Sequence, residues 1–421
     1  MDHAEEKSNF KHSCVRRIVV TLELKSTLRR INMRKFLSTT AAAIALAFTT
    51  VPVANAADLK VGLVLTLSGP PGALGKQAED GFNLAVEKLG GSLGGANTTV
   101  VVVDDELKPD VALTRVKSLL ERDDVDIVVG TIFSNMLAAI YKPVIKADKI
   151  LISPNAGPST FAGEKCHPNF FVTSYQNNQN FEALGKYAQD NGVKRVFMLA
   201  PNYQAGRDAM NGFKKYFKGD IADEVFTPLG HKDFSAEIAQ IATSKSDAVF
   251  TFMPGGMGVR FVKQFDEAGL SDKMTFLSAF TVDETTLPAQ KDAAVGLFGA
   301  GTWAPDFDLD RSKDFVSSFE AKYGYVPGSY AMQAYDAALL IDSAVSAVDG
   351  DVSNKEGLMA ALKEAKFDSM RGTFTFNNNQ YPIQDFYLLN IAKRADGKYQ
   401  TEIAEKILEN SGDSFAAECK M

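Results

Sequence analysis

The sequence is poor in the side chains that most often carry out chemistry. Its 421 residues include 4 histidines and 3 cysteines. His167 and His231, the two histidines beyond the N-terminal region, have no cysteine or histidine partner at the spacing of a metal site. We also expect no serine nucleophile elbow, the sharp strand-to-helix turn of α/β-hydrolases. The prediction is therefore a protein that is not an enzyme and that has no metal and no cofactor.

Two glycine-rich loops match phosphate-binding motifs only in part. Gly69 and Gly75 have five residues between them instead of four, and Gln77 stands where a phosphate loop needs Ser or Thr for magnesium. The loop 254–258 follows a predicted strand but lacks the G-x-G-x-x-G order of dinucleotide sites. Neither loop predicts a nucleotide.

A long apolar run occurs only near the N-terminus. Met33-Arg34-Lys35 is a basic start, residues 36–53 are small and apolar, and Ala54-Asn55-Ala56 is an A-x-A cleavage site. A membrane anchor is the alternative, but the run is short and rich in alanine. We predict a signal peptide over 33–56, a mis-called extension over 1–32 and export to the periplasm, with Ala57 as the first mature residue.

Basic residues are the minority in the part expected to be mature. Loss of residues 1–56 removes nine Lys+Arg and four Asp+Glu, which leaves 36 and 48 and a net charge of −12. This acidic balance argues against a nucleic-acid partner. Only Cys166 and Cys419 remain, in an oxidising compartment. We predict that they form a disulfide, and two free buried thiols are the alternative.

Strands and helices alternate along the chain, which indicates parallel sheets covered on both faces. The length favours two domains. The polar segment 173–180 interrupts the alternation, which then starts again. We predict an α/β fold of two doubly wound parallel-sheet lobes with crossings near 176, 303 and 380. Lobe 1 would contain 57–176 with 304–380, and lobe 2 would contain 177–303 with 381–421.

Two neighbouring strand ends in the stretch 125–158 carry hydroxyl, amide and glycine residues. The strand 126–129 leads to Gly130 and to a helix that opens near Ser134, and the strand 150–152 leads into 153–158. Ligands of open α/β sheets bind outside the carboxyl ends of strands, where a helix N-terminus attracts anions. This stretch is predicted to hold the carboxylate of a small ligand.

Four features follow one another after the predicted signal peptide: Val61-Gly62 to Ser68-Gly69-Pro70 with Leu74-Gly75, Gly130 to Ser134, Ile152 to Ala156, and the loop with Tyr203 and Gly206. In these features the chain resembles the periplasmic solute-binding proteins of ABC importers, in the family that includes the leucine/isoleucine/valine-binding proteins. The resemblance covers nearly all of 57–421. It implies a type I periplasmic-binding fold that closes on its ligand, an ABC permease in the inner membrane as partner, and a monomer.

The resemblance also implies the ligand-binding residues. The family holds the ligand carboxylate at positions matching Ser134, Asn155, Ala156 and Gly157. The position of Leu74 covers the ligand's side chain, and Tyr203 reaches in from the second lobe.

One position departs from the amino-acid binders of the family. These place a carboxylate after the last strand of the second lobe to hold the ligand ammonium, and this sequence has Phe280 there. Because a buried ammonium without a counter-charge is costly, Phe133, Tyr203 and Phe280 are expected to form an apolar slot for a ring. Pro254 is a further candidate ligand-binding residue.

The chain looks like the branch that binds aromatic carboxylates such as benzoate or cinnamate derivatives, and the tail from Arg371-Gly372 to Leu388 adds to that similarity. A binder of branched-chain or other amino acids stays open as an alternative, particularly if Asp283 or Glu284 turns inward. A periplasmic sensory module is a third possibility.

Overall fold

The computed structural model describes residues 58–421. The predicted extension (1–32) and signal peptide (33–56) lie outside these residues. The described part belongs to one compact unit with two β-sheets. None of its helices is long and apolar enough to cross a membrane.

The first sheet belongs to the first lobe and is almost entirely parallel. Its strands, in spatial order, are β2 (Ser92–Leu93), β3 (Ala96–Asp104), β1 (Asp58–Leu65), β4 (Ile127–Gly130), β5 (Ile150–Ser153) and β6 (Phe170–Val172). Only the short hairpin strand β2 is antiparallel to its neighbour. Every residue of β4 and β5 is buried, as expected for strands that helices cover on both faces.

The second sheet is parallel from β8 to β11 and antiparallel beyond. Its strands, in spatial order, are β12 (Thr375–Phe376), β13 (Pro382–Lys393), β11 (Phe298–Gly301), β10 (Thr275–Ser278), β9 (Ala248–Thr251), β7 (Arg195–Pro201) and β8 (Asp220–Thr227), and β14 (Tyr399–Ser411) pairs with β13. β13 pairs antiparallel with β11 and with β14, so the last part of the chain extends this sheet beyond β11.

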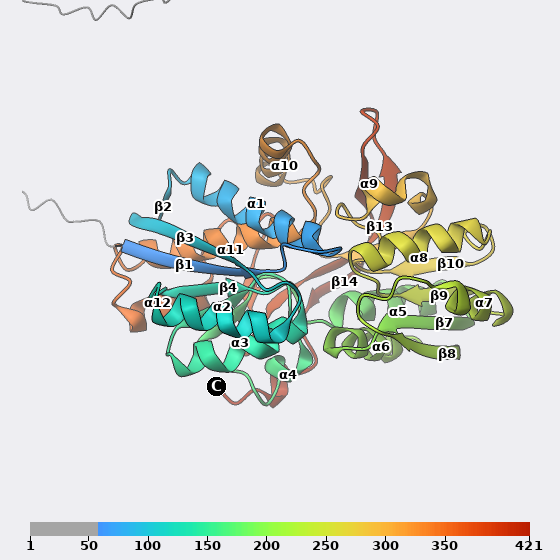
Figure 1. Cartoon of the computed structure of the whole chain (residues 1–421), viewed down its shortest axis with the longest axis horizontal. Helices are drawn as coiled ribbons and strands as arrows, with labels where there is room; N and C mark the ends of the chain where they lie inside the picture. Colours follow the sequence, from blue (N-terminus) through green and yellow to red (C-terminus); the bar gives the residue numbers. More distant parts are fainter. Residues whose placement is uncertain (1–57) are drawn as a thin grey trace, which may run out of the picture. The chain divides into compact units, whose positions relative to one another are not determined.

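Helices cover both faces of each sheet (Figure 1). The helices associated with the first sheet are α1 (Gly72–Lys88), α2 (Pro109–Glu121), α3 (Ser134–Lys146), α4 (Ser159–Ala162), α10 (Asp310–Tyr323), α11 (Ser329–Ser346) and α12 (Lys355–Glu364). Those associated with the second are α5 (Gln179–Asp190), α6 (Gln204–Tyr216), α7 (Ser235–Thr243), α8 (Gly256–Glu267), α9 (Leu287–Gln290) and the 3₁₀ turn η1 (Lys291–Ala294). α1 packs against α11, and α2 packs against α3. The predicted two-lobed α/β fold is confirmed.

A buried ion pair holds the crossings to the first lobe. The Arg371 guanidinium lies 3.1 Å from the Asp336 carboxylate on α11. It also donates to the carbonyl oxygens of Thr173 (2.5 Å) and Ser174 (3.0 Å), where the chain leaves β6. A further bond of 2.5 Å reaches Gln384 Oε1 on β13. One side chain therefore ties α11 to the segments that precede α5 and follow β12.

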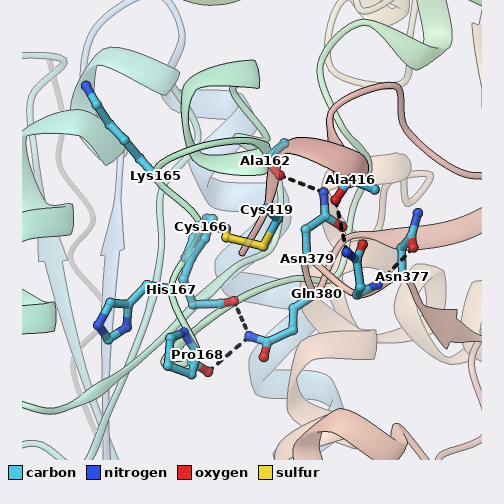
Figure 2. The surroundings of a disulfide bond; sticks show 12 residues. Ala162, Lys165, Cys166, His167, Pro168, Asn377, Asn379, Gln380, Ala416 and Cys419 are labelled. Atoms are coloured by element: carbon cyan, nitrogen blue, oxygen red, sulfur yellow. Dashed lines mark hydrogen bonds between the residues drawn. A yellow bond between two sulfur atoms is a disulfide. The ribbon is translucent and has the colours of Figure 1, made fainter. Parts of the chain in front are cut away.

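The end of the chain is fastened to the first lobe (Figure 2). Cys166, in the connection between α4 and β6, forms a disulfide with Cys419, at the end of the 3₁₀ turn η2 (Ala416–Glu418). Nearby, the Asn379 amide donates to the Ala162 carbonyl (2.8 Å) and the Gln380 amide to the Pro168 carbonyl (3.0 Å). The segment before β13 and the C-terminus thus share one anchor on the first lobe.

Local sequence signals account for features of two helices, α12 and α2. Asn354 Oδ1 accepts a bond from the Gly357 N–H (3.0 Å) at the start of α12, which makes Asn354 the N-cap of that helix. The apolar residues Leu113, Val116 and Leu120 indicate an amphipathic helix, and the structure has α2 there. α2 buries Ala112, Val116 and Leu119, and Leu120 is partly buried against the core.

Candidate ligand-binding site

A cavity lies where the strand ends of the two sheets face each other. The empty space among its residues, counted with its opening to solvent, is about 360 Å³. The lining residues are Leu74, Ile132, Phe133, Ser134, Asn155, Ala156, Tyr175, Asn177, Phe181, Tyr203, Ala205, Phe252, Pro254, Phe280 and Tyr330. None of these residues is acidic or basic.

Most residues that the sequence singled out meet at this cavity. Those that line it are Leu74, Phe133, Ser134, Asn155, Ala156, Tyr203, Pro254 and Phe280. Gly157 differs from the expectation, because it is not among the lining residues. Its N–H donates to Asn177 Oδ1 (3.0 Å) and its carbonyl accepts from the Asn177 N–H (2.7 Å).

Gly157 has a packing reason to be glycine. A Cβ built on it would lie 1.9 Å from the Tyr175 carbonyl oxygen, so the segment after β5 can pass this close to the crossing only without a side chain. Gly157 therefore allows the segment after β5 to lie close to the backbone at Tyr175. Its N–H is not left for a ligand.

The side chain of Asn155 also forms hydrogen bonds within the protein. Its Nδ2 donates to the Ile132 carbonyl (2.6 Å) and its Oδ1 accepts from the Tyr175 hydroxyl (2.8 Å). The Ala156 N–H donates to the Thr131 carbonyl (3.2 Å). These bonds join the two loops after β4 and β5, and the Ala156 N–H is not left for a ligand.

Backbone donors are left at the cavity in the first turn of α3 and at one position after β5. The N–H groups of Ser134, Asn135 and Asn155 have no acceptor within residues 58–421. The first N–H groups of a helix have no partner inside the helix, and the helix dipole favours an anion there. Ser134 is 3% exposed, so water supplies little competition.

Aromatic rings form the walls of the cavity. Tyr203 lies against Phe133 (centroids 6.2 Å apart) and Phe252 (6.1 Å). Phe280 stacks on Tyr175 at 5.2 Å, with 25° between the ring planes, and meets Tyr330 edge-on at 6.0 Å. Offset and edge contacts at these spacings are the favourable geometries of aromatic pairs, and a planar ring is the guest that they suit.

Phe280 is held in an unusual backbone conformation. Its φ is +59°, in the left-handed region that a bulky residue adopts at an energetic cost. The next residue fixes the loop, since Thr281 Oγ1 accepts from the Met253 N–H (2.9 Å) and the Thr281 carbonyl accepts from the Gln290 amide (2.8 Å). The loop is thereby arranged to aim a ring at the cavity.

Sequence reasoning missed several lining residues. The aromatic ones are Tyr175, Phe181, Phe252 and Tyr330. Tyr175 stands in the polar segment already noted, and Phe252 comes two residues before Pro254, so their positions gave some signal. Tyr330 lies in the first turn of α11, far along the chain, and only the return of the chain to the first lobe brings it to the cavity.

Asp283 and Glu284 are buried but do not line the cavity. Asp283 Oδ1 accepts from the Thr285 N–H (2.8 Å), whereas Oδ2 has no hydrogen-bond partner among the described residues. Glu284 Oε1 accepts from Thr401, and burial raises the pKa of Glu284 to about 7. Burial likewise raises the pKa of Asp283.

Enzymatic groups do not assemble in the described part of the chain. Residues 58–421 contain no cluster of three or more His, Cys, Asp or Glu that could hold a metal. The letters Gly-x-Ser-x-Gly do occur at 90–94, but this segment follows helix α1 and Ser92 starts the hairpin strand β2. A nucleophile elbow instead follows a strand and precedes a helix.

Comparison with known proteins identifies the class. A family model for periplasmic binding proteins matches residues 58–398, and the chain belongs to this family. The Leu/Ile/Val-binding protein homolog 6 of Brucella melitensis is 27% identical over 394 residues, which cover 90% of this chain and 98% of that protein.

Solved structures of ABC-transporter solute-binding proteins give the same result. One from R. palustris, in complex with benzoate, is 33% identical, with a TM-score of 0.82, and the match covers 86% of this chain and all (100%) of that one. Another, from Rhodopseudomonas palustris BisB5 with 3,4-dihydroxybenzoic acid, is 28% identical, with a TM-score of 0.80 and coverage of 85% and 99%. A leucine-binding protein from Thermotoga maritima, at 19% identity and a TM-score of 0.73 with coverage of 83% and 98%, shares the fold.

The protein is therefore a solute-binding protein of an ABC transporter and not an enzyme, as the sequence predicted.

Proposed function

We propose that the protein captures a small aromatic carboxylate, of the benzoate or cinnamate type, and delivers it to an ABC permease. The observation that carries the proposal is the chemistry of the cavity, where uncharged donors at one edge face a set of aromatic rings and no lining residue is charged. A carboxylate finds N–H groups and a helix N-terminus there. The ammonium of an amino acid finds no counter-charge.

The mechanism follows from where the donors and rings lie. The first lobe supplies Ser134 and the backbone N–H groups, which take the carboxylate, and the second lobe supplies Tyr203, Phe252 and Phe280, which close over the ring. Closure removes water, and each donor contact strengthens as the local dielectric falls. The permease would then recognise a closed form whose population the ligand has raised.

The experiment that tests the proposal is a ligand panel read by thermal shift and calorimetry. We expect benzoate and 4-hydroxybenzoate to raise the melting temperature of the mature protein, because a ligand that binds only the folded state stabilises it by mass action. Leucine and isoleucine are expected to give no shift. Stabilisation by leucine with no response to the aromatic acids would contradict the proposal.

An amino-acid ligand is the second candidate, and Asp283 is the observation in its favour. This carboxylate follows Phe280 by three residues and keeps one buried oxygen without a partner. Its charge acts on the phenols of Tyr330 and Tyr175, whose pKa values burial already raises. The same panel separates the candidates, since a loop shift that turned Asp283 inward would favour leucine over benzoate.

Ser134 should contribute directly to affinity. Replacing it by alanine removes one donor to a charged group, which is worth about 1.5–3 kcal/mol, so we expect Ser134→Ala to weaken binding at least 10-fold. Calorimetry with benzoate measures the change. Ser317→Ala, an exposed position on α10, is the matched control and should bind like the wild type. Unchanged affinity in Ser134→Ala would remove Ser134 from the site.

A further inference from the structure

Asp208 is a buried carboxylate without a cationic partner. It lies on α6, is 3% exposed, and forms no ion pair with any residue in 58–421. Four hydrogen bonds reach it instead: from the Ser159 N–H (3.2 Å), Ser159 Oγ (2.8 Å), Asn177 Nδ2 (3.0 Å) and Gln204 Nε2 (2.9 Å). Burial of an ion is costly unless donors surround it, so this arrangement calls for an explanation.

Asn177 links Asp208 to the ligand cavity. Its Oδ1 accepts from the Gly157 N–H (3.0 Å), which fixes the orientation of the amide. Its Nδ2 therefore carries the two donor hydrogens, one directed at Asp208 Oδ2 (3.0 Å) and the other at Ser134 Oγ (3.1 Å). The side chain has no alternative orientation that satisfies both Gly157 and Asp208.

The consequence falls on the hydroxyl of Ser134. A serine hydroxyl has one hydrogen to donate, and its oxygen can accept. Because Asn177 donates to this oxygen, the hydrogen of Ser134 is directed elsewhere, and no described residue accepts it. Ser134 lines the cavity, so the hydrogen is available to a ligand carboxylate.

The hydrogen bonds from Asp208 through Asn177 to Ser134 form a relay, and this relay also joins the two lobes. Asp208 follows β7 of the second sheet, whereas Ser159 opens α4 after β5 of the first. Asn177 is bonded to Gly157 of the first lobe, and the neighbouring Asn178 packs against Gly212 of α6, where a Cβ would lie 2.4 Å from the Asn178 carbonyl oxygen. Separation of Ser159 from Asp208 would return the carboxylate to water.

We propose that Asp208 and Asn177 are positioning residues that hold the Ser134 hydroxyl as a donor to the ligand carboxylate, and that they make this donor depend on the approach of the second lobe. The proposal rests on the proposed function only in requiring a ligand with a carboxylate, which an aromatic acid and an amino acid share. Simple electrostatics predicts the opposite sign for Asp208, since a nearby negative charge repels an anionic ligand.

A double-mutant cycle tests the relay. Asp208→Asn, Ser134→Ala and the double variant are titrated with benzoate by calorimetry. We expect Asp208→Asn to weaken binding about 10-fold, the loss of roughly one good hydrogen bond, while the double variant binds within about twofold of Ser134→Ala alone, because both changes disable the same donor. Ser159→Ala, which removes one donor to Asp208, should give a smaller loss that also disappears in the Ser134→Ala background.

Three controls keep the outcome clear. Asp223→Asn, an exposed position on β8, should leave affinity unchanged. The unfolding midpoint of each ligand-free variant shows whether folding is affected. If benzoate fails to bind the wild type, the cycle is run with leucine, so failure of the aromatic assignment and failure of the relay give different results. Unchanged or tighter binding in Asp208→Asn, or losses that multiply in the double variant, would overturn the relay.

Discussion

Replacing Asp336 by alanine is expected to lower the free energy of unfolding by about 3–5 kcal/mol, the cost of leaving one member of a buried ion pair without its partner. The side chain of Arg371 is 5% exposed and that of Asp336 is 0% exposed. The unpaired guanidinium would stay buried, because its other bonds to Thr173, Ser174 and Gln384 still hold it in place. Urea denaturation measures the change.

A surface ion pair supplies the control for this prediction. Lys313 and Asp308 form a pair in which the Asp308 side chain is 93% exposed. Water and salt screen such pairs, so Asp308→Ala should leave stability close to that of the wild type. If Asp336→Ala behaved like Asp308→Ala, the crossings would not depend on the Arg371 pair, and the anchoring described for them would be wrong.

Removing the disulfide should have the second large effect. Cys166 and Cys419 are 253 residues apart in sequence. A cross-link that closes a long loop restricts the unfolded chain, and loss of a native disulfide typically costs about 2–5 kcal/mol. We expect the double variant Cys166→Ser/Cys419→Ser to unfold at a lower urea concentration than the oxidised wild type.

Reduction of the wild type checks the same prediction without mutation. Dithiothreitol should bring the wild-type midpoint to that of the double variant and leave the double variant unchanged. A midpoint for the double variant equal to that of the oxidised wild type would show that the hydrogen bonds of Asn379 and Gln380 hold the C-terminal region without the disulfide.

The sequence predicted site residues best where they directly follow a strand. Parallel strands end at one edge of a sheet, so Ser134 could be placed near a cavity from the strand pattern. Phe280 was assigned to the site through the resemblance to the family. The strand pattern could not show what Asn155 and Gly157 bond to, because a polar group at a strand end can equally well bond to the neighbouring loop. The structure shows that Asn155 bonds to Ile132 and Tyr175, and that Gly157 bonds to Asn177.

Site residues that come from distant parts of the chain could not be predicted from local sequence patterns. Tyr330 reaches the cavity because α11 returns to the first lobe, and Asp208 reaches Ser159 because α6 packs across from α4. Neither contact has a short-range signature.

The named relatives and the solved structures that resemble this chain differ in the ligands that they are said to bind. The Brucella relatives are named for leucine, isoleucine and valine at 24–27% identity, whereas the R. palustris structures hold benzoate and hydroxylated benzoates at 27–33%. The cavity of this chain has aromatic walls and no lining acid. The proposed ligand panel therefore includes both benzoates and branched-chain amino acids.

A crystal structure of the mature protein grown with benzoate tests the central claim most directly. The account predicts the carboxylate within hydrogen-bonding distance of Ser134 Oγ and the Asn155 N–H, with the ring between Tyr203 and Phe280. Benzoate bound outside this cavity would contradict it, as would a co-purified amino acid whose ammonium is held by Asp283.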